Sequence, residues 1–203
     1  MSEGLAGALA VVVAYLIGSI DFAVIVARMH GVNIHEVGSG NPGATNVMRA
    51  LGKGPAVMVF VGDALKGVIA AATGTLLTGA TSSMSFWAFA AGLAAVVGHC
   101  YPLFHRFRGG KGVATSGGVV FFTMPVVGLI LTAMWAVVAR LSRVSSIASL
   151  TVVVATIPLA IWQGVKGAAL LPLFAILLLV IYRHRGNISR ILRRSEQKVT
   201  LEH

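Results

Sequence analysis

Residues 113–139 read VATSGGVVFFTMPVVGLILTAMWAVVA, and this stretch decides how often the chain crosses a membrane. A membrane-spanning helix needs about 20 apolar residues, so the stretch is long for one crossing and short for two. Pro125 disfavours helix at the residue before it and starts a new helix well, so we expect a break at Thr123-Met124-Pro125. Halves of about 10 to 15 residues, rising about 1.5 Å each, would not cross a core of ~30 Å unaided. We therefore expect two short helices here, shielded by the rest of the protein.

Five further stretches are apolar and long enough to form helices in a bilayer. They cover residues 5–26, 55–78, 86–104, 147–161 and 168–182. Of the 203 residues, 57% are hydrophobic and 11% are charged, whereas a soluble domain carries about 25% charged residues. The first stretch is not a cleaved signal peptide, because it is too long and lacks a basic leader and a cleavage site. The composition indicates an all-α integral membrane protein.

The basic residues lie mainly between these stretches and indicate how the chain is oriented. A net charge of +10 in a soluble protein would suggest a nucleic-acid partner, but in a membrane protein Lys and Arg gather in cytoplasmic loops. Clusters follow residues 5–26, 86–104, 113–139 and 168–182, and the other connections carry almost none. All clusters share one side if residues 113–139 cross twice or re-enter. We predict a compact seven-helix bundle with its N-terminus outside and its C-terminus in the cytoplasm, and no nucleic-acid partner.

The chain has the organisation of one membrane-embedded domain. We assign residues 1–200 to it and interpret residues 201–203 as the remnant of an expression tag. The 24 glycines favour close helix packing, and no internal repeat supports an inverted-repeat transporter. A single cysteine, Cys100, excludes an internal disulfide. No His, Cys or carboxylate spacing suggests a metal site, so we expect neither a metal nor a cofactor.

The first polar loop, residues 35–49, has the composition of an anion-binding segment. Residues 38–46 include three Gly, one Pro and small polar side chains, and such a backbone can turn its N–H groups toward one point. We expect Thr45-Asn46 to cap the helix that carries Arg49, where an anion would meet the positive end of the helix dipole. The alternative is a flexible loop with a capped helix.

The second polar loop ends in Gly109-Gly110-Lys111-Gly112 and opens the helix at residue 113. It is not a P-loop, because the spacing differs and no strand precedes it, yet bare backbone, one Lys and a helix start suit a phosphate. Arg106 and Arg108 are typical of anchors at the membrane surface. His99 is typical of a hydrogen-bonded structural histidine.

The third polar segment follows the last apolar stretch. His184 and Asn187 are three residues apart and share a helix face, and we expect Glu196 to pair with the basic residues of the tail. That tail also has the pattern of an amphipathic segment on anionic lipid. In the second apolar stretch Asp63 and Lys66 can pair on one face, for either a structural or a functional reason.

Missing motifs restrict the chemistry that the chain can perform. The sequence lacks the His-x4-Asp dyad of common glycerolipid acyltransferases and the Gly-x-Ser-x-Gly of serine hydrolases. Catalysis would therefore depend on Lys, Arg, His and neutral polar groups.

Three motifs in order resemble the bacterial acyl-phosphate:glycerol-3-phosphate acyltransferase family over essentially the whole chain. They are GSGNPGATNVMR at residues 38–49, GHCYPLFHRFRGGKGVAT at residues 98–115, and HRGNISR at residues 184–190 with Glu196 beyond it. The Asp63 and Lys66 pair is also similar to that family. Family members usually have Gly at the position of Arg194 and often Pro at that of Asp21, a residue for which the sequence suggests no role.

The resemblance implies an enzyme of the bacterial inner membrane with a cytoplasmic active site. Its expected partners are acyl phosphate, glycerol 3-phosphate and membrane lipid, and we expect a monomer. The implied catalytic residues are Ser39, Arg49, Lys111 and His184. The implied phosphate-binding residues are Ser39, Asn41, Arg49, Gly110, Lys111, Ser149, His184 and Asn187. The implied supporting residues are Asp63, Lys66, His99 and Glu196.

The sequence leaves two questions open, the identity of the catalytic base and the alternative of a transport function. The base that takes the proton of the attacking hydroxyl is either His184 or the phosphate of glycerol 3-phosphate, and the resemblance favours the substrate phosphate. A transporter or flippase for a phosphorylated small molecule or lipid would also use anion sites within a helical bundle.

Overall fold

The structure, a computed structural model, describes residues 1–198, and every regular element in that range is helical. The interpretation of residues 201–203 as a tag remnant lies outside the described residues. The α-helices are α1 Glu3–Gly18, α2 Phe22–Met29, α3 Ala44–Leu51, α4 Lys53–Thr78, α5 Phe86–Cys100, α6 Val113–Thr123, α7 Pro125–Ser142, α8 Ser145–Trp162, α9 Leu170–Arg183 and α10 Arg185–Leu192. Two short 3₁₀ helices, η1 Leu103–His105 and η2 Gly167–Ala169, complete the chain.

The apolar stretches of the sequence coincide with these helices. Within residues 1–198, five segments are long and apolar enough to cross a membrane, or six if the bent pair formed by Gly167–Arg183 and Arg185–Leu192 counts as one. Helix α6 is a shorter apolar helix of 11 residues. The prediction of an all-α membrane protein with seven apolar helical segments is confirmed.

The expected break at Pro125 is present, but only one of the two helices beside it is short. Met124 leaves the helical region at φ −141° and Pro125 is the first residue of α7. Helix α7 has 18 residues, about 27 Å at 1.5 Å each, so the expectation of two short halves is wrong for α7. It continues beyond residue 139 through Arg140, whose long side chain suits a helix end at the membrane surface, and stops at Arg143, where φ is +56°.

The first apolar stretch is interrupted by Asp21, which thereby gains a structural role. Helix α1 ends at Gly18 and α2 begins at Phe22. The Asp21 side chain caps α2 by accepting a hydrogen bond from the Val24 N–H at 3.0 Å. An aspartate here therefore starts a new helix inside one membrane-spanning segment.

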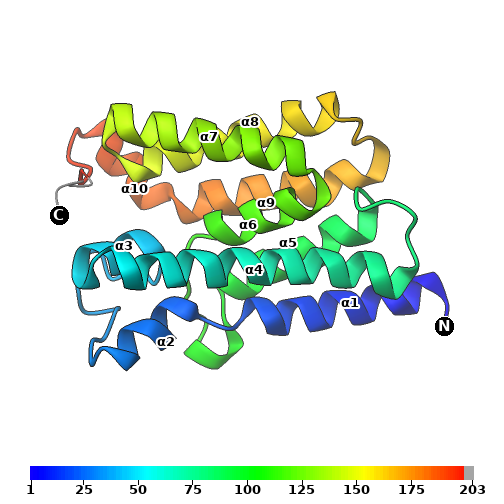
Figure 1. Ribbon diagram of the computed structural model, residues 1–203, viewed down its shortest axis with the longest axis horizontal. Coiled ribbons are helices and arrows are strands. Elements are labelled where there is room, and N and C mark those ends of the chain that lie inside the picture. Colours follow the sequence, from blue (N-terminus) through cyan, green and yellow to red (C-terminus); the bar gives the residue numbers. More distant parts are fainter. Residues whose placement is uncertain (199–203) are drawn as a thin grey trace.

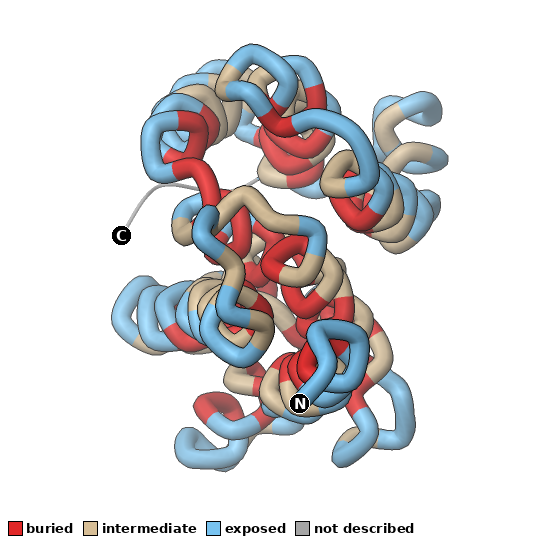
Figure 2. Tube along the Cα trace, turned by 90° about the vertical axis from the view of Figure 1, so that its right-hand side faces the viewer, coloured by how far each residue is buried: buried red, intermediate tan, exposed pale blue. Residues whose placement is uncertain are grey.

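The helices form two groups that meet at α6 and along a direct contact between α5 and α9. Helices α1, α4 and α5 pack together, as do α7, α8 and α9, while α6 contacts α4, α5 and α7. Figure 1 shows α6 between the two groups, with α3 and α10 at the end of the molecule opposite the N-terminus. Buried segments face the interior in Figure 2, and the outward faces are exposed. Those faces carry large apolar side chains, as lipid contact requires, including Leu76, Trp162, Leu171 and Leu178.

Glycines let α4 and α6 approach until their backbones touch. A Cβ atom on Gly67 of α4 would collide with the Thr115 carbonyl oxygen, and one on Gly118 of α6 would collide with the Ala64 carbonyl oxygen. Small residues at a helix crossing are a common device in membrane bundles, where van der Waals contact replaces the hydrophobic effect. This crossing fixes α6, and with it the Lys111 loop that precedes α6.

We expect Gly118→Ala to destabilise the protein by about 1–3 kcal/mol, because the added methyl group must push α6 away from α4. The neighbouring Gly117→Ala is the matched control, since a Cβ there meets no atom within 4 Å. Thermal unfolding of both variants in the same detergent measures the difference. Equal stability of the two variants would show that the α4–α6 contact is not tight.

Candidate active site

The loop before α6 is built from backbone that neighbouring elements hold on two sides. The Gly110 N–H donates to the His99 carbonyl at the end of α5, at 3.0 Å. On the other side, Arg183 donates from Nε to the Gly110 carbonyl at 2.9 Å and from Nη2 to the Gly109 carbonyl at 2.6 Å. The loop ends at Gly112, whose φ of +85° suits glycine. The Gly110 N–H is thus engaged within the protein, and Lys111 is the side chain that the loop presents.

Lys111 is connected to the third motif through Asn187. Its Nζ donates to Asn187 Oδ1 at 2.7 Å, and the Asn187 amide donates to Glu196 Oε1. Asn187 is buried, and Glu196 lies in the segment after α10. A cation, an amide and a carboxylate therefore form one chain of hydrogen bonds that joins the second and third motifs.

Glu196 gathers donors from two helices. Beside Asn187, it accepts from Ser146 of α8 at 2.8 Å and from Arg190 of α10 at 2.6 Å, so the ion pair expected with the basic tail is present. Partial burial raises the pKa of Glu196, but the hydrogen bonds from Asn187, Ser146 and Arg190 outweigh it and leave that pKa below its usual value. A stable carboxylate here holds the Asn187 amide and leaves its oxygen free to accept from Lys111.

Lys111 has an ammonium group that is easier to deprotonate than usual. Its pKa falls from 10.5 to about 8 because burial disfavours the charged form; Glu196 opposes this shift, and Arg190, Arg49 and Arg183 add to it. An incoming anion would relieve the repulsion among these cations. Arg49 of α3 lies in the same region, where its Nη2 donates to the Gln197 carbonyl at 3.4 Å.

His184 joins α9 to α10 and is almost fully buried. Its Nδ1 lies 2.8 Å from the Val180 carbonyl oxygen, and because a carbonyl only accepts, Nδ1 carries the hydrogen. Nε2 of the neutral ring then keeps its lone pair, as a hydrogen-bond acceptor or a base requires.

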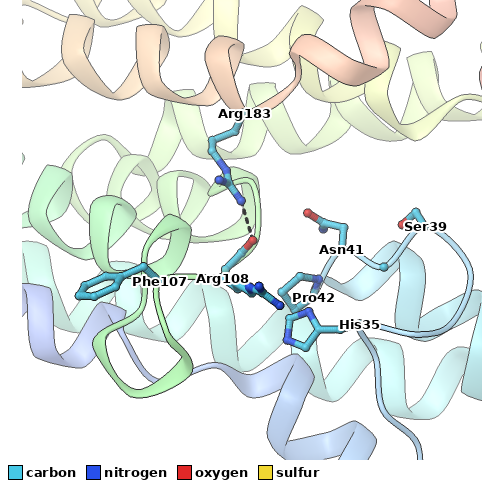
Figure 3. Close-up of a pocket in the computed structure, with 9 residues that line it drawn as sticks. His35, Ser39, Asn41, Pro42, Phe107, Arg108 and Arg183 are labelled. Atoms are coloured by element: carbon cyan, nitrogen blue, oxygen red, sulfur yellow. Dashed lines mark hydrogen bonds between the residues drawn. The ribbon is translucent and has the colours of Figure 1, made fainter.

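The first motif borders a cleft of about 470 Å³ next to the Lys111 loop. It is lined by His35, Ser39, Gly40, Asn41, Pro42, Phe107, Arg108, Gly109 and Arg183. Figure 3 shows Arg183 reaching from α9 toward the Gly109 carbonyl, with Asn41 and Ser39 on the facing loop. The structure thus brings Ser39 and Asn41 of the first motif to the glycines of the second.

Asn46 folds this first loop instead of capping α3. Helix α3 begins after Gly43 without a side-chain cap, so the expected cap by Thr45-Asn46 is wrong. Asn46 Oδ1 accepts from the Ser39 N–H at 2.9 Å, and its amide donates to the Val37 and Ile34 carbonyls. A buried amide that satisfies three backbone groups within the loop is not available to the helix end. It thereby fixes the position of Ser39.

Ser149 is buried on α8, one helical turn beyond Ser146. Its hydroxyl accepts from Trp135 Nε1 of α7 at 3.2 Å. This contact joins α7 to α8, whereas Ser146 is the serine on this face that bonds to the Asn187 and Glu196 chain.

The Asp63–Lys66 pair contacts His99, the residue whose carbonyl accepts from Gly110 of the Lys111 loop. Lys66 Nζ is 2.7 Å from Asp63 Oδ1, 2.9 Å from the Ile20 carbonyl and 2.8 Å from His99 Nδ1. Asp63 and Lys66 are each 2% exposed, and the buried ammonium group makes one ion pair and two hydrogen bonds. The pair therefore supports His99, whose carbonyl holds Gly110. Of the two explanations for the pair, a structural and a functional one, this favours the structural one.

Arg183 is a site residue that the sequence analysis does not single out, because it is one of several basic residues that follow the last apolar stretch. Its position directly before His184 was the available signal. Among residues 1–198, no group of three or more His, Cys, Asp or Glu side chains is arranged to hold a metal ion.

Comparisons with known proteins agree on one family. The family model described as glycerol-3-phosphate acyltransferase matches residues 8–194. The glycerol-3-phosphate acyltransferase of Rubrobacter xylanophilus is 42% identical over 200 residues, which cover 94% of each chain. That of Legionella pneumophila strain Corby is 43% identical over 198 residues, covering 95% of this chain and 69% of the relative.

Solved structures give the same result for the fold. The crystal structure of PlsY, an integral membrane glycerol 3-phosphate acyltransferase, in its glycerol 3-phosphate form has a TM-score of 0.89 and 41% identity, with 96% of both chains covered. Its lysophosphatidic acid form has a TM-score of 0.87 at 41% identity, covering 95% of this chain and 94% of that one. The fold, the three motifs and these relatives together show that the chain belongs to the glycerol-3-phosphate acyltransferase family of integral membrane enzymes.

Proposed function

We propose that this enzyme transfers a fatty acyl group from acyl phosphate to the sn-1 hydroxyl of glycerol 3-phosphate, giving lysophosphatidic acid and inorganic phosphate. The observation that carries the proposal is the Lys111–Asn187 hydrogen bond, which joins the second and third motifs. It lies next to a cleft that residues of the first and second motifs line. The names of the relatives support the acceptor, since PlsY was crystallised in glycerol 3-phosphate and lysophosphatidic acid forms.

The donor follows from the kind of groups that gather at the site. Acyl phosphate is a mixed anhydride with a good leaving group, so it needs no enzyme nucleophile. Two anionic substrates must instead be held together against their repulsion and aligned, and such positioning can supply about 7–11 kcal/mol of the barrier. Lys111 and Arg49 supply positive charge for this purpose, and Ser39, Asn41 and Asn187 supply neutral hydrogen bonds.

The reaction forms one bond and breaks another at the acyl carbonyl. The sn-1 oxygen attacks the carbonyl carbon, and the carbon–oxygen bond to phosphate breaks with its electron pair leaving on phosphate. Lys111 stabilises the negative charge that develops on the carbonyl oxygen and on the departing phosphate. The hydroxyl proton passes either to His184 Nε2 or to the phosphate of glycerol 3-phosphate. A near-normal turnover of His184→Ala would favour the second route.

The enzyme is proposed to act as a monomer at the cytoplasmic face of the bacterial inner membrane. Lys111 comes from the loop before α6, Arg49 from α3 and Asn187 from α10. Helices α3 and α10 lie at the end of the molecule that also carries the basic C-terminal segment. Positively charged segments remain in the cytoplasm, which supports this orientation. The acyl chain would lie between helices, reached from the bilayer.

A transfer assay separates this proposal from transport. Purified protein in a lipidic phase receives acyl phosphate and labelled glycerol 3-phosphate, without acyl-CoA or acyl carrier protein. We expect labelled lysophosphatidate and an equal amount of phosphate. Uptake of glycerol 3-phosphate into proteoliposomes without acyl transfer would support the transporter alternative instead.

A further inference from the structure

The glycine-rich loop needs an external support that its own sequence does not provide. Three of the four residues from Gly109 to Gly112 are glycine, and glycine has the largest conformational freedom of any residue. Fixing the backbone of each residue opposes binding by about 1–2 kcal/mol. If the loop became ordered only when substrate bound, this loss of conformational entropy would weaken substrate binding.

Arg183 supports the loop at two successive peptide groups. Its Nε and Nη2 hydrogens lie in one plane and meet the Gly110 and Gly109 carbonyls at 2.9 and 2.6 Å. The Gly110 carbonyl belongs to the peptide group that also carries the Lys111 N–H. Holding this carbonyl therefore fixes the plane from which the Lys111 side chain departs.

The guanidinium is itself held in place. It lies over the Tyr101 ring with 5.1 Å between Cζ and the ring centre, a distance at which cation–π attraction acts. The Tyr101 carbonyl in turn accepts from the Tyr15 hydroxyl at 3.0 Å. On the opposite side of the loop, His99 accepts from Gly110, and Lys66 holds the His99 ring. The loop thus lies between a fixed histidine and a fixed arginine.

Arg183 also connects the two motifs that the reaction needs together. It is the last residue of α9, directly before His184 and four residues before Asn187, the hydrogen-bond partner of Lys111. Lys111 is therefore tied to this part of the chain twice, through Asn187 and through Arg183. A lysine at position 183 would keep the charge but lose the planar pair of donors.

We propose that Arg183 is a positioning residue for acyl transfer, which clamps the Gly109 and Gly110 carbonyls so that Lys111 stays aimed at the substrate phosphate beside Asn187. The clamp keeps the loop ordered before substrate arrives and couples it to the α9–α10 junction. This inference rests on the proposed function, since acyl transfer is its readout.

The test compares Arg183→Lys and Arg183→Ala with Arg185→Ala. Arg185 is the matched control, because it is exposed, lies over the Tyr182 ring at 4.5 Å and is two residues away. In both Arg183 variants we expect kcat/KM for glycerol 3-phosphate to fall by about 100-fold and KM to rise. A loss of this size is typical of a catalytic group that has moved out of position. Arg185→Ala should stay within a few-fold of wild type. Methylguanidinium should partly restore Arg183→Ala and leave Lys111→Ala inactive.

These readouts distinguish a positioning role from a loss of folded protein. A smaller folded fraction lowers the apparent kcat but leaves KM unchanged and is not rescued by a guanidinium ion. Hydrogen exchange of the Gly110 amide should be faster in Arg183→Lys than in Arg185→Ala, independently of activity. Arg183 variants with wild-type KM and exchange would overturn the inference. A wild-type protein without acyl transfer would instead overturn the proposed function.

Discussion

We expect Lys111→Ala to lower kcat/KM for acyl transfer by about 10³-fold, the loss that follows when one group that stabilises developing negative charge is removed. The ammonium is the one cation of the glycine-rich loop and already meets Asn187 at 2.7 Å. Two neighbouring cations are held by other partners, Arg183 by the Gly109 and Gly110 carbonyls and Arg190 by Glu196.

The control for this variant is another lysine near the start of a helix, one that is not part of the site. Lys53→Ala serves as the control, because Lys53 is exposed at the start of α4. Initial rates with acyl phosphate and glycerol 3-phosphate measure both variants, and circular dichroism confirms that each is folded. Activity of Lys111→Ala within tenfold of wild type would remove Lys111 from the proposed mechanism.

The pH dependence of the wild-type enzyme gives a second view of the same group. The pKa of Lys111 is lowered to about 8 by burial, so its charge is complete well below pH 8 and is lost as the pH rises through that value. Because catalysis requires the charged form, kcat/KM should decline on the alkaline side near pH 8, since this ratio reports the free enzyme. In Lys111→Arg, whose guanidinium stays charged, any residual activity should lack this decline.

Local rules predicted the fold because they act within short stretches of sequence. The break at Pro125 follows from the geometry of a single residue, and the structure places it there. The length of α7 did not follow, because Arg140 has an ordinary place on a helix that reaches the membrane surface. The interruption at Asp21 also depends on one side chain, which was seen in the sequence but not recognised as a helix cap.

The site was less predictable, since its contacts join distant parts of the chain. Motif composition pointed to Lys111 and Asn187, yet their hydrogen bond spans 76 residues in sequence. The Arg183 contact to Gly110 spans 73 residues, and the position of Arg183 directly before His184 gives no sign of a contact with so distant a loop. Asn46 was assigned to a helix cap by its position, whereas the fold of the loop places its amide among loop carbonyls.

Lys66→Met should destabilise the protein by about 3–5 kcal/mol, because it leaves the Asp63 carboxylate buried without its partner. Asp63 and Lys66 lie 2.7 Å apart and are each 2% exposed, so neither water nor lipid headgroups can solvate a remaining charge. The same change removes the donor that holds His99 Nδ1, so the His99 carbonyl becomes a less fixed support for Gly110. Thermal unfolding in detergent measures the loss, with Lys53→Met as an exposed control.

The double variant Asp63→Leu/Lys66→Met distinguishes an unpaired charge from lost packing. Replacing both partners of a buried ion pair with apolar side chains is often neutral or stabilising, so the double variant should be more stable than Lys66→Met alone. It should not regain full stability, because the Ile20 carbonyl and His99 Nδ1 still lack the Lys66 donor. A double variant no more stable than the single one would show that Lys66 acts through packing and through these two hydrogen bonds. His99 holds the loop that presents Lys111. If the double variant regained stability but not activity, the pair would contribute to activity through its contact with His99.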